Sequence, residues 1–187
     1  VGLTVGYNNK LYNVAAAIQD GKLLGLVPKR WIPNYSEFYE GRYFNPGWEK
    51  TIEVSWDGYQ VPMGMKLLFS CDNVENLVVG AEICEDVWVL NPPSIAHASA
   101  GATVIVNCSA SDEVTGKSEY RRSLISGQSA RLLCAYIYAN AGEGESSQDL
   151  VFGGQNIIAE NGNILSESAR FENQTIYADI DLERLVM

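Results

Sequence analysis

The middle of the chain alternates apolar, strand-like runs with helical patterns, and this alternation restricts the possible fold more than any other feature. The strand-like runs cover residues 77–83, 102–110 and 134–141. Helical patterns lie between them, over residues 92–101 and 118–133, and Asn91 before Pro92 is a favourable helix start. A strand–helix–strand–helix–strand order is typical of an α/β fold with strands covered by helices.

Both ends of the chain are rich in hairpin signals. The turn signals are Asn8-Asn9, Asp20-Gly21, Asp57-Gly58 and Asn161-Gly162, and such pairs accept the positive φ of tight turns. Strands are also expected at 51–56, 65–71, 150–154, 155–160, 163–168 and 174–181. A polar loop is expected at 142–149. Residues 29–48, with many aromatic rings, two prolines and two glycines, predict a packed loop with a short helix near Tyr35–Glu40.

Composition narrows the class of protein. A chain of 187 residues with 47% apolar content suits one globular domain with a sizeable core. The net charge of −10 argues against a nucleic-acid or anionic-membrane partner, and the sequence has no run of eighteen apolar residues. The four cysteines have no CxxC or zinc-ligand spacing, so we expect reduced thiols and a cytoplasmic location.

Cys84 ends the apolar run of LVVGAEICEDVW and precedes two acids and a tryptophan. A thiol at the end of a buried strand is either a buried structural residue or a nucleophile held rigidly yet within reach of a substrate. His97 is the only histidine and lies among small residues of a predicted helix, which favours a structural or surface role over that of a catalytic base. GxSxG, HExxH, P-loop and GxGxxG motifs are absent. The remaining mechanism is a cysteine activated by lysine and carboxylate.

Four segments carry a resemblance to a known family. They are LVPKRWIPNYSEFYEGRYF with Lys29, GAEICEDVW with Cys84, NCSASDEVTGKSEYRR (107–122) and GEGESSQDLVFGGQNIIAENG (142–162). Together they resemble the carbon–nitrogen hydrolase (nitrilase) superfamily and, more narrowly, the glutamine-hydrolysing domain of glutamine-dependent NAD synthetase. The resemblance covers nearly the whole chain and implies a four-layer αββα sandwich with a Glu–Lys–Cys triad.

The resemblance also implies roles for individual residues. Cys84 matches the nucleophile, Lys29 the triad lysine and Glu40 a second glutamate near that lysine. A fixed ammonium next to a thiol lowers the thiol pKa, and it stabilises the oxyanion that forms when the thiolate attacks an amide. The backbone N–H of Glu85 is the natural second oxyanion donor.

For recognition of glutamine, the resemblance points to Glu85 and Ser111 for the α-ammonium and to Tyr35 and Phe38 for the methylene arm. Each has a simpler alternative. The two rings would then pack the loop, Ser111 would cap a turn, and Glu85 and Asp86 would be solvated acids at a strand end.

In the family, the general base is a glutamate that precedes the part matching Val1. We therefore expect residues 1–187 to be an N-terminally truncated domain that hydrolyses glutamine poorly alone, exposes apolar surface and self-associates. A synthetase domain would follow in the same polypeptide. That domain would bind ATP, Mg²⁺ and deamido-NAD, and we expect no cofactor in this one. Two alternatives remain, another carbon–nitrogen hydrolase (an aliphatic amidase or carbamoylase) and a catalytically silent scaffold.

Overall fold

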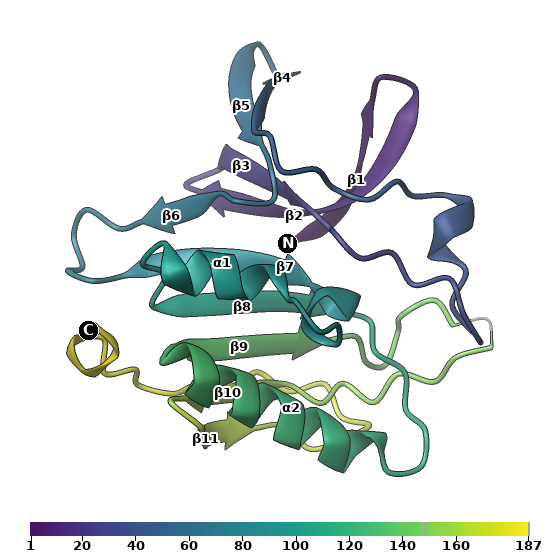
Figure 1. Ribbon diagram of the computed structural model, residues 1–187. Helices are drawn as coiled ribbons and strands as arrows, with labels where there is room; N and C mark the ends of the chain where they lie inside the picture. The colour runs from purple at the N-terminus through teal and green to yellow at the C-terminus, as the bar shows by residue number, and fades with distance from the viewer. Residues whose placement is uncertain (148, 187) are drawn as a thin grey trace.

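The computed structural model describes residues 1–147 and 149–186, which form two β-sheets and two α-helices (Figure 1). The first sheet has the strand order β1-β2-β3-β5-β4. Its strands are β1 (Gly2–Tyr7), β2 (Lys10–Gln19), β3 (Lys22–Pro28), β4 (Ile52–Trp56) and β5 (Tyr59–Met63). The predicted turns are present, because Asn8, Asn9, Asp20 and Asp57 all have positive φ.

The second sheet has the strand order β11-β10-β9-β8-β7-β6. Its strands are β6 (Leu68–Ser70), β7 (Val78–Ile83), β8 (Val104–Ser109), β9 (Ala135–Asn140), β10 (Ile157–Glu160) and β11 (Asn163–Glu167). β7, β8 and β9 run parallel and are connected by α1 (Pro93–Ser99) and α2 (Lys117–Leu132). Both helices lie on one face of this sheet (Figure 1). The predicted alternation in the middle of the chain is therefore confirmed.

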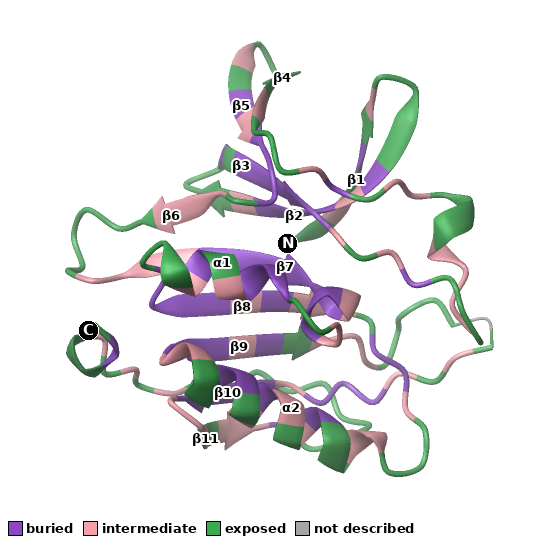
Figure 2. Ribbon diagram, viewed as in Figure 1, coloured by how far each residue is buried: buried purple, intermediate pink, exposed green. Residues whose placement is uncertain are grey.

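The two faces of β7 pack against different layers. Ala81 and Ile83 pack with Ala15 and Val27 of the first sheet, whereas Gly80 faces His97 of α1 so closely that a Cβ there would lie 2.9 Å from the His97 side chain. Strands β7, β8 and β9 are buried over much of their length (Figure 2). Within the described residues the layers are thus helices, sheet and sheet, which are three of the four layers of the expected sandwich.

Several local expectations were wrong. α1 begins at Pro93, so Pro92, rather than Asn91, is its N-cap. The short helix is a 3-10 turn at Glu40–Arg42, later than expected. β5 was missed, and residues 150–154 and 174–181 form no strand. The expected polar loop at 142–149 includes position 148, which lies outside the described residues.

Candidate active site

Cys84 lies on a tight turn directly after β7. It begins the 3-10 turn Cys84–Val87 with a φ of +45°, a conformation that residues other than glycine rarely adopt. Its backbone N–H donates to Oδ1 of Asn107 in the neighbouring strand β8 at 3.0 Å. With 9% of its surface exposed, Cys84 is held rigidly at the carboxyl end of a buried parallel strand.

Lys29 and Glu40 reach the same place from the loop that follows β3 of the first sheet. Lys29 follows β3, and its Nζ lies 2.8 Å from both carboxylate oxygens of Glu40. The Lys29 side chain is fully buried, while that of Glu40 is 28% exposed. Lys29, Glu40 and Cys84 line one cavity of about 360 Å³, together with Ser109 at the end of β8 and Ala110 directly after it. The three catalytic candidates from the sequence (the nucleophile, the triad lysine and the second glutamate) are therefore neighbours in space.

The protonation of Cys84 reflects opposing influences. Burial raises the pKa of its thiol above the ordinary value. The Lys29 charge, the Ala110 backbone N–H and the Ser109 hydroxyl lower that pKa, whereas the Glu40 charge raises it. Lys29 is thus the strongest of the groups that favour the thiolate, which is the reactive form.

Asp86, two residues beyond Cys84, is not the solvated acid of the alternative interpretation. It is 1% exposed and accepts backbone N–H bonds from Arg30, Trp31 and Ile83. Burial raises its pKa to about 7 against the effect of these hydrogen bonds. Sequence reasoning missed this residue, because one acid beside another at a strand end carries no signal of burial.

Glu85, which directly follows Cys84, and Tyr35 form a pair beside the Cys84 cavity, here called the rim, although neither residue lines the cavity itself. The Tyr35 hydroxyl donates to the Glu85 carboxylate, with oxygen distances of 2.9 and 3.0 Å. Burial raises the pKa of Glu85, which the hydrogen bond from Tyr35 and the charges of Lys29 and Lys117 oppose. The Tyr35 and Phe38 rings meet edge to face with centroids 5.8 Å apart.

Lys117, at the start of α2, was not singled out from the sequence. Its Nζ lies 5.5 Å from the centroid of the Phe38 ring and 5.7 Å from that of Trp88 and forms an ion pair with Asp112. The sequence did carry a signal for this residue, because Lys117 belongs to segment 107–122, one of the segments that resemble the family. It adds positive charge close to the Glu85 rim.

Ser111 lies one residue beyond the lining of the cavity. It is buried, and its Oγ accepts a hydrogen bond from the Arg121 guanidinium at 3.2 Å. Its backbone N–H donates to Asn140 Oδ1 at 2.8 Å. The structure therefore places Ser111 in a rigid loop beside the site, with its hydroxyl engaged by a buried cation.

His97 takes no part in this site. It is buried in α1 with Nε2 2.8 Å from the backbone oxygen of Met65, and Nδ1 has no hydrogen-bond partner in the described part of the chain. Burial lowers its pKa, which keeps the ring neutral. The expected structural role is confirmed. The four cysteines are free thiols.

Comparison with known proteins identifies the family of this chain. Residues 1–186 match the family model of carbon-nitrogen hydrolases. A glutamine-dependent NAD(+) synthetase of Mycobacterium tuberculosis is 44% identical over 187 residues, which is 99% of this chain and 28% of that protein. The chain therefore spans little more than a quarter of the relative that it matches.

Solved structures share the fold. A glutamine-dependent NAD(+) synthetase from Cytophaga hutchinsonii superposes with a TM-score of 0.79 at 29% identity, over 91% of this chain and 27% of that one. A carbon-nitrogen hydrolase from Helicobacter pylori superposes with a TM-score of 0.74 at 19% identity, over 98% of this chain and 62% of that one. The expected nitrilase-like α/β fold is confirmed, and the chain belongs to the carbon-nitrogen hydrolase family.

Proposed function

We propose that this domain hydrolyses the side-chain amide of glutamine through a thioester on Cys84. The observation that carries the proposal is the buried Lys29 ammonium, which is held by both oxygens of Glu40 and lines the same cavity as the Cys84 thiol. The similarity to glutamine-dependent NAD(+) synthetases supports glutamine as the amide. Ammonia would pass to a synthetase domain of the same polypeptide.

The acylation step follows from the positions of three groups. The Cys84 thiolate attacks the amide carbon, and the carbonyl oxygen takes up the negative charge. The Lys29 ammonium and the Glu85 backbone N–H would stabilise that oxygen, and donors preorganised for such an oxyanion contribute strongly to catalysis. As the tetrahedral intermediate collapses, a carboxylic acid protonates the amide nitrogen, which leaves as ammonia. The resulting carboxylate then takes a proton from the water that cleaves the thioester. The family resemblance assigns both proton transfers to a glutamate of the longer polypeptide. Glu40 keeps the ammonium in place during these steps.

Recognition of the amino-acid end would use the rim. The Glu85 carboxylate, oriented by the Tyr35 hydroxyl, suits an α-ammonium, and the nearby Lys117 ammonium suits an α-carboxylate. The Phe38 ring, which contacts Tyr35, offers an apolar surface for the methylene arm. The role of Ser111 rests on the family resemblance alone, because Arg121 already engages its hydroxyl.

The remaining partners belong to the longer polypeptide. ATP, Mg²⁺ and deamido-NAD would bind the synthetase domain, and self-association of the glutaminase domain would cover its exposed apolar surface. None of the helices in residues 1–147 and 149–186 is long and apolar enough to cross a membrane.

A glutamine-like diazo-ketone tests the proposal at the acylation step, which needs Cys84 and Lys29 but no complete turnover. We expect peptide mass spectrometry to find the label on Cys84 alone, and we expect L-glutamine, but not D-glutamine or propionamide, to protect it. Protection by propionamide would favour an aliphatic amidase. Unselective labelling of all four cysteines, Cys71, Cys84, Cys108 and Cys134, would favour a silent scaffold.

A further inference from the structure

Asp86 accepts hydrogen bonds from three backbone N–H groups, two in the loop that follows β3 of the first sheet and one at the end of β7 of the second sheet. Its Oδ1 accepts from Arg30 at 3.1 Å and from Trp31 at 2.8 Å, and its Oδ2 accepts from Ile83 at 3.0 Å. Arg30 and Trp31 directly follow Lys29, and Ile83 directly precedes Cys84. One buried side chain therefore joins the segment that carries the lysine to the turn that carries the nucleophile.

The turn at Cys84 does not itself require all of these bonds. A side chain at the third position of a helical turn stabilises the turn by accepting the N–H of the cap residue, which here is Ile83. The bonds from Arg30 and Trp31 span 56 and 55 residues of sequence and add nothing to the turn. They act between the two sheets, at the point where Lys29 meets Cys84.

We propose that Asp86 is a positioning residue that holds the Lys29 ammonium opposite the Cys84 thiol. This inference deepens the proposed function and rests on it. Hydrogen bonds to a carboxylate are shorter and stronger than those between neutral groups, so three of them in a buried site fix the spacing of the two segments. Lys29 favours the thiolate only while it stays close, because the attraction between charges falls with distance.

Asp86→Asn is the main test, since the amide keeps the shape but loses the charge and turns an N–H₂ group toward N–H donors. Glu160→Gln is the matched control. Glu160 is also a buried carboxylate that accepts a backbone N–H, from Asp181 at 2.7 Å, but it lies in β10 and does not line the Cys84 cavity. The comparison separates the loss of any buried carboxylate from the loss of this one.

The readout is the rate of alkylation by iodoacetamide at each cysteine, measured by peptide mass spectrometry from about pH 6 to about pH 10. We expect Asp86→Asn to shift the Cys84 profile to higher pH and to lower its rate at pH 7 about tenfold. In Asp86→Asn, the plateau rate of Cys84 at high pH and the rate at exposed Cys71 should stay as in the parent chain. In Glu160→Gln, the whole Cys84 profile should match that of the parent chain. Apart from Asp86 itself in Asp86→Asn, both variants keep the titratable and charged groups around Cys84, which are Lys29, Tyr35, Glu40, Glu85, Cys108, Lys117, Tyr138 and Glu145.

Two results would overturn the proposal. One is an unchanged Cys84 profile in Asp86→Asn. The other is faster alkylation of both Cys84 and buried Cys134 in Asp86→Asn, because that pattern reports loosening of the whole domain. If Asp86→Asn does not fold, Asp86→Glu, which keeps the charge, takes its place, with a smaller shift expected. Failure of both to fold while Glu160→Gln folds would make Asp86 purely structural. Iodoacetamide needs no glutamine recognition, so this result is independent of the diazo-ketone experiment.

Discussion

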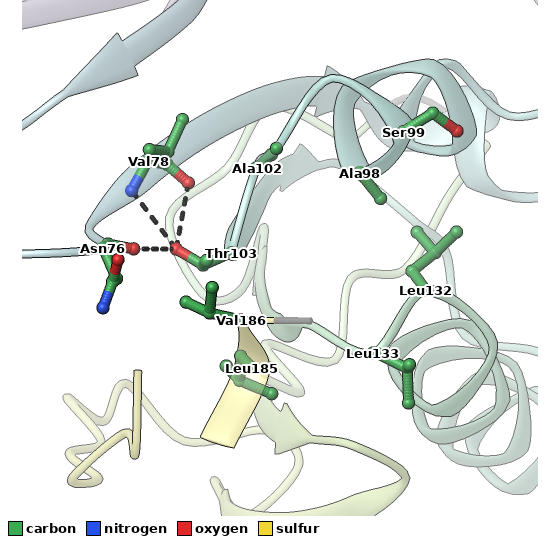
Figure 3. Close-up of a pocket in the computed structure, with 11 residues that line it drawn as sticks. Asn76, Val78, Ala98, Ser99, Ala102, Thr103, Leu132, Leu133, Leu185 and Val186 are labelled. Carbon is green, nitrogen blue, oxygen red and sulfur yellow. Dashed lines mark hydrogen bonds between the residues drawn. The ribbon is translucent and has the colours of Figure 1, made fainter. Parts of the chain in front are cut away.

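Two cavities of similar size lie toward opposite ends of the parallel strands. The Cys84 cavity, of about 360 Å³, lies at the carboxyl ends of β7 and β8. The other cavity, of about 320 Å³, lies at their amino ends and is lined by Val78, Ala102 and Thr103, with leucines from α2 and the C-terminal segment (Figure 3). Volume alone does not distinguish them.

The two cavities differ in the chemistry of the polar side chains that line them. In the second cavity, the Thr103 hydroxyl donates to Asn76 O at 2.6 Å and accepts the Val78 N–H at 3.2 Å (Figure 3), so it completes the backbone bonding of a loop. The first cavity is lined by the Cys84 thiol and by the Lys29–Glu40 ion pair. Ligands of open α/β sheets bind at the carboxyl ends of strands. We propose the first cavity as the site because of the thiol and the charged side chains in its lining, rather than because of its volume.

The largest expected effect is that of Cys84→Ala. Removal of the thiol should abolish incorporation of the diazo-ketone, because no other nucleophile is proposed to react. Mass spectrometry of the intact chain measures the loss. Ser99→Ala in the second cavity is the control and should leave incorporation unchanged, whereas residual labelling of Cys84→Ala would contradict the assignment.

Lys29→Met should slow incorporation about 100-fold, because it removes both the oxyanion partner and the charge that favours the thiolate. Lys29 lowers the pKa of Cys84, so its loss raises that pKa and moves the rate–pH profile to higher pH. Lys66→Met, which breaks an exposed ion pair with Glu49, is the control. A profile that moves to lower pH would refute this electrostatic role.

Glu40→Gln should lower incorporation only roughly threefold to tenfold, because two effects oppose each other. Lys29 loses its bidentate partner, but the negative charge that raises the pKa of Cys84 is also removed. We therefore expect a slower reaction together with a Cys84 profile shifted to lower pH. Incorporation and alkylation profiles measured on the same samples would show whether this opposite shift occurs.

Thr103→Val should have the smallest effect on chemistry. The variant loses the hydrogen bonds of the Thr103 hydroxyl in the second cavity, which should lower the free energy of unfolding by about 1 kcal/mol. Urea denaturation measures that change. Incorporation at Cys84 should equal that of the parent chain, and a marked decrease would mean that the two cavities are coupled.

Much of the fold was predictable, because the signals are local. Asn and Asp at the hairpin turns tolerate positive φ wherever they occur, and apolar periodicity identified β7, β8 and β9. β5 was missed because Tyr59–Met63 contains a proline, a residue that is rare inside strands. The short run at 150–154 carried an apolar signal, but it pairs only through an isolated bridge between Phe152 and Asp112.

The sequence by itself determined the order of elements in the middle of the chain, the hairpin turns and, through the family motifs, the candidates Lys29, Glu40 and Cys84. Only the tertiary structure decided that the lysine is fully buried, that Glu40 holds it with both oxygens, and that Asp86 joins two sheets. The physical reason is that turn conformation depends on neighbouring residues, whereas burial and charge pairing depend on segments that are distant in the chain and meet only when the sheets pack.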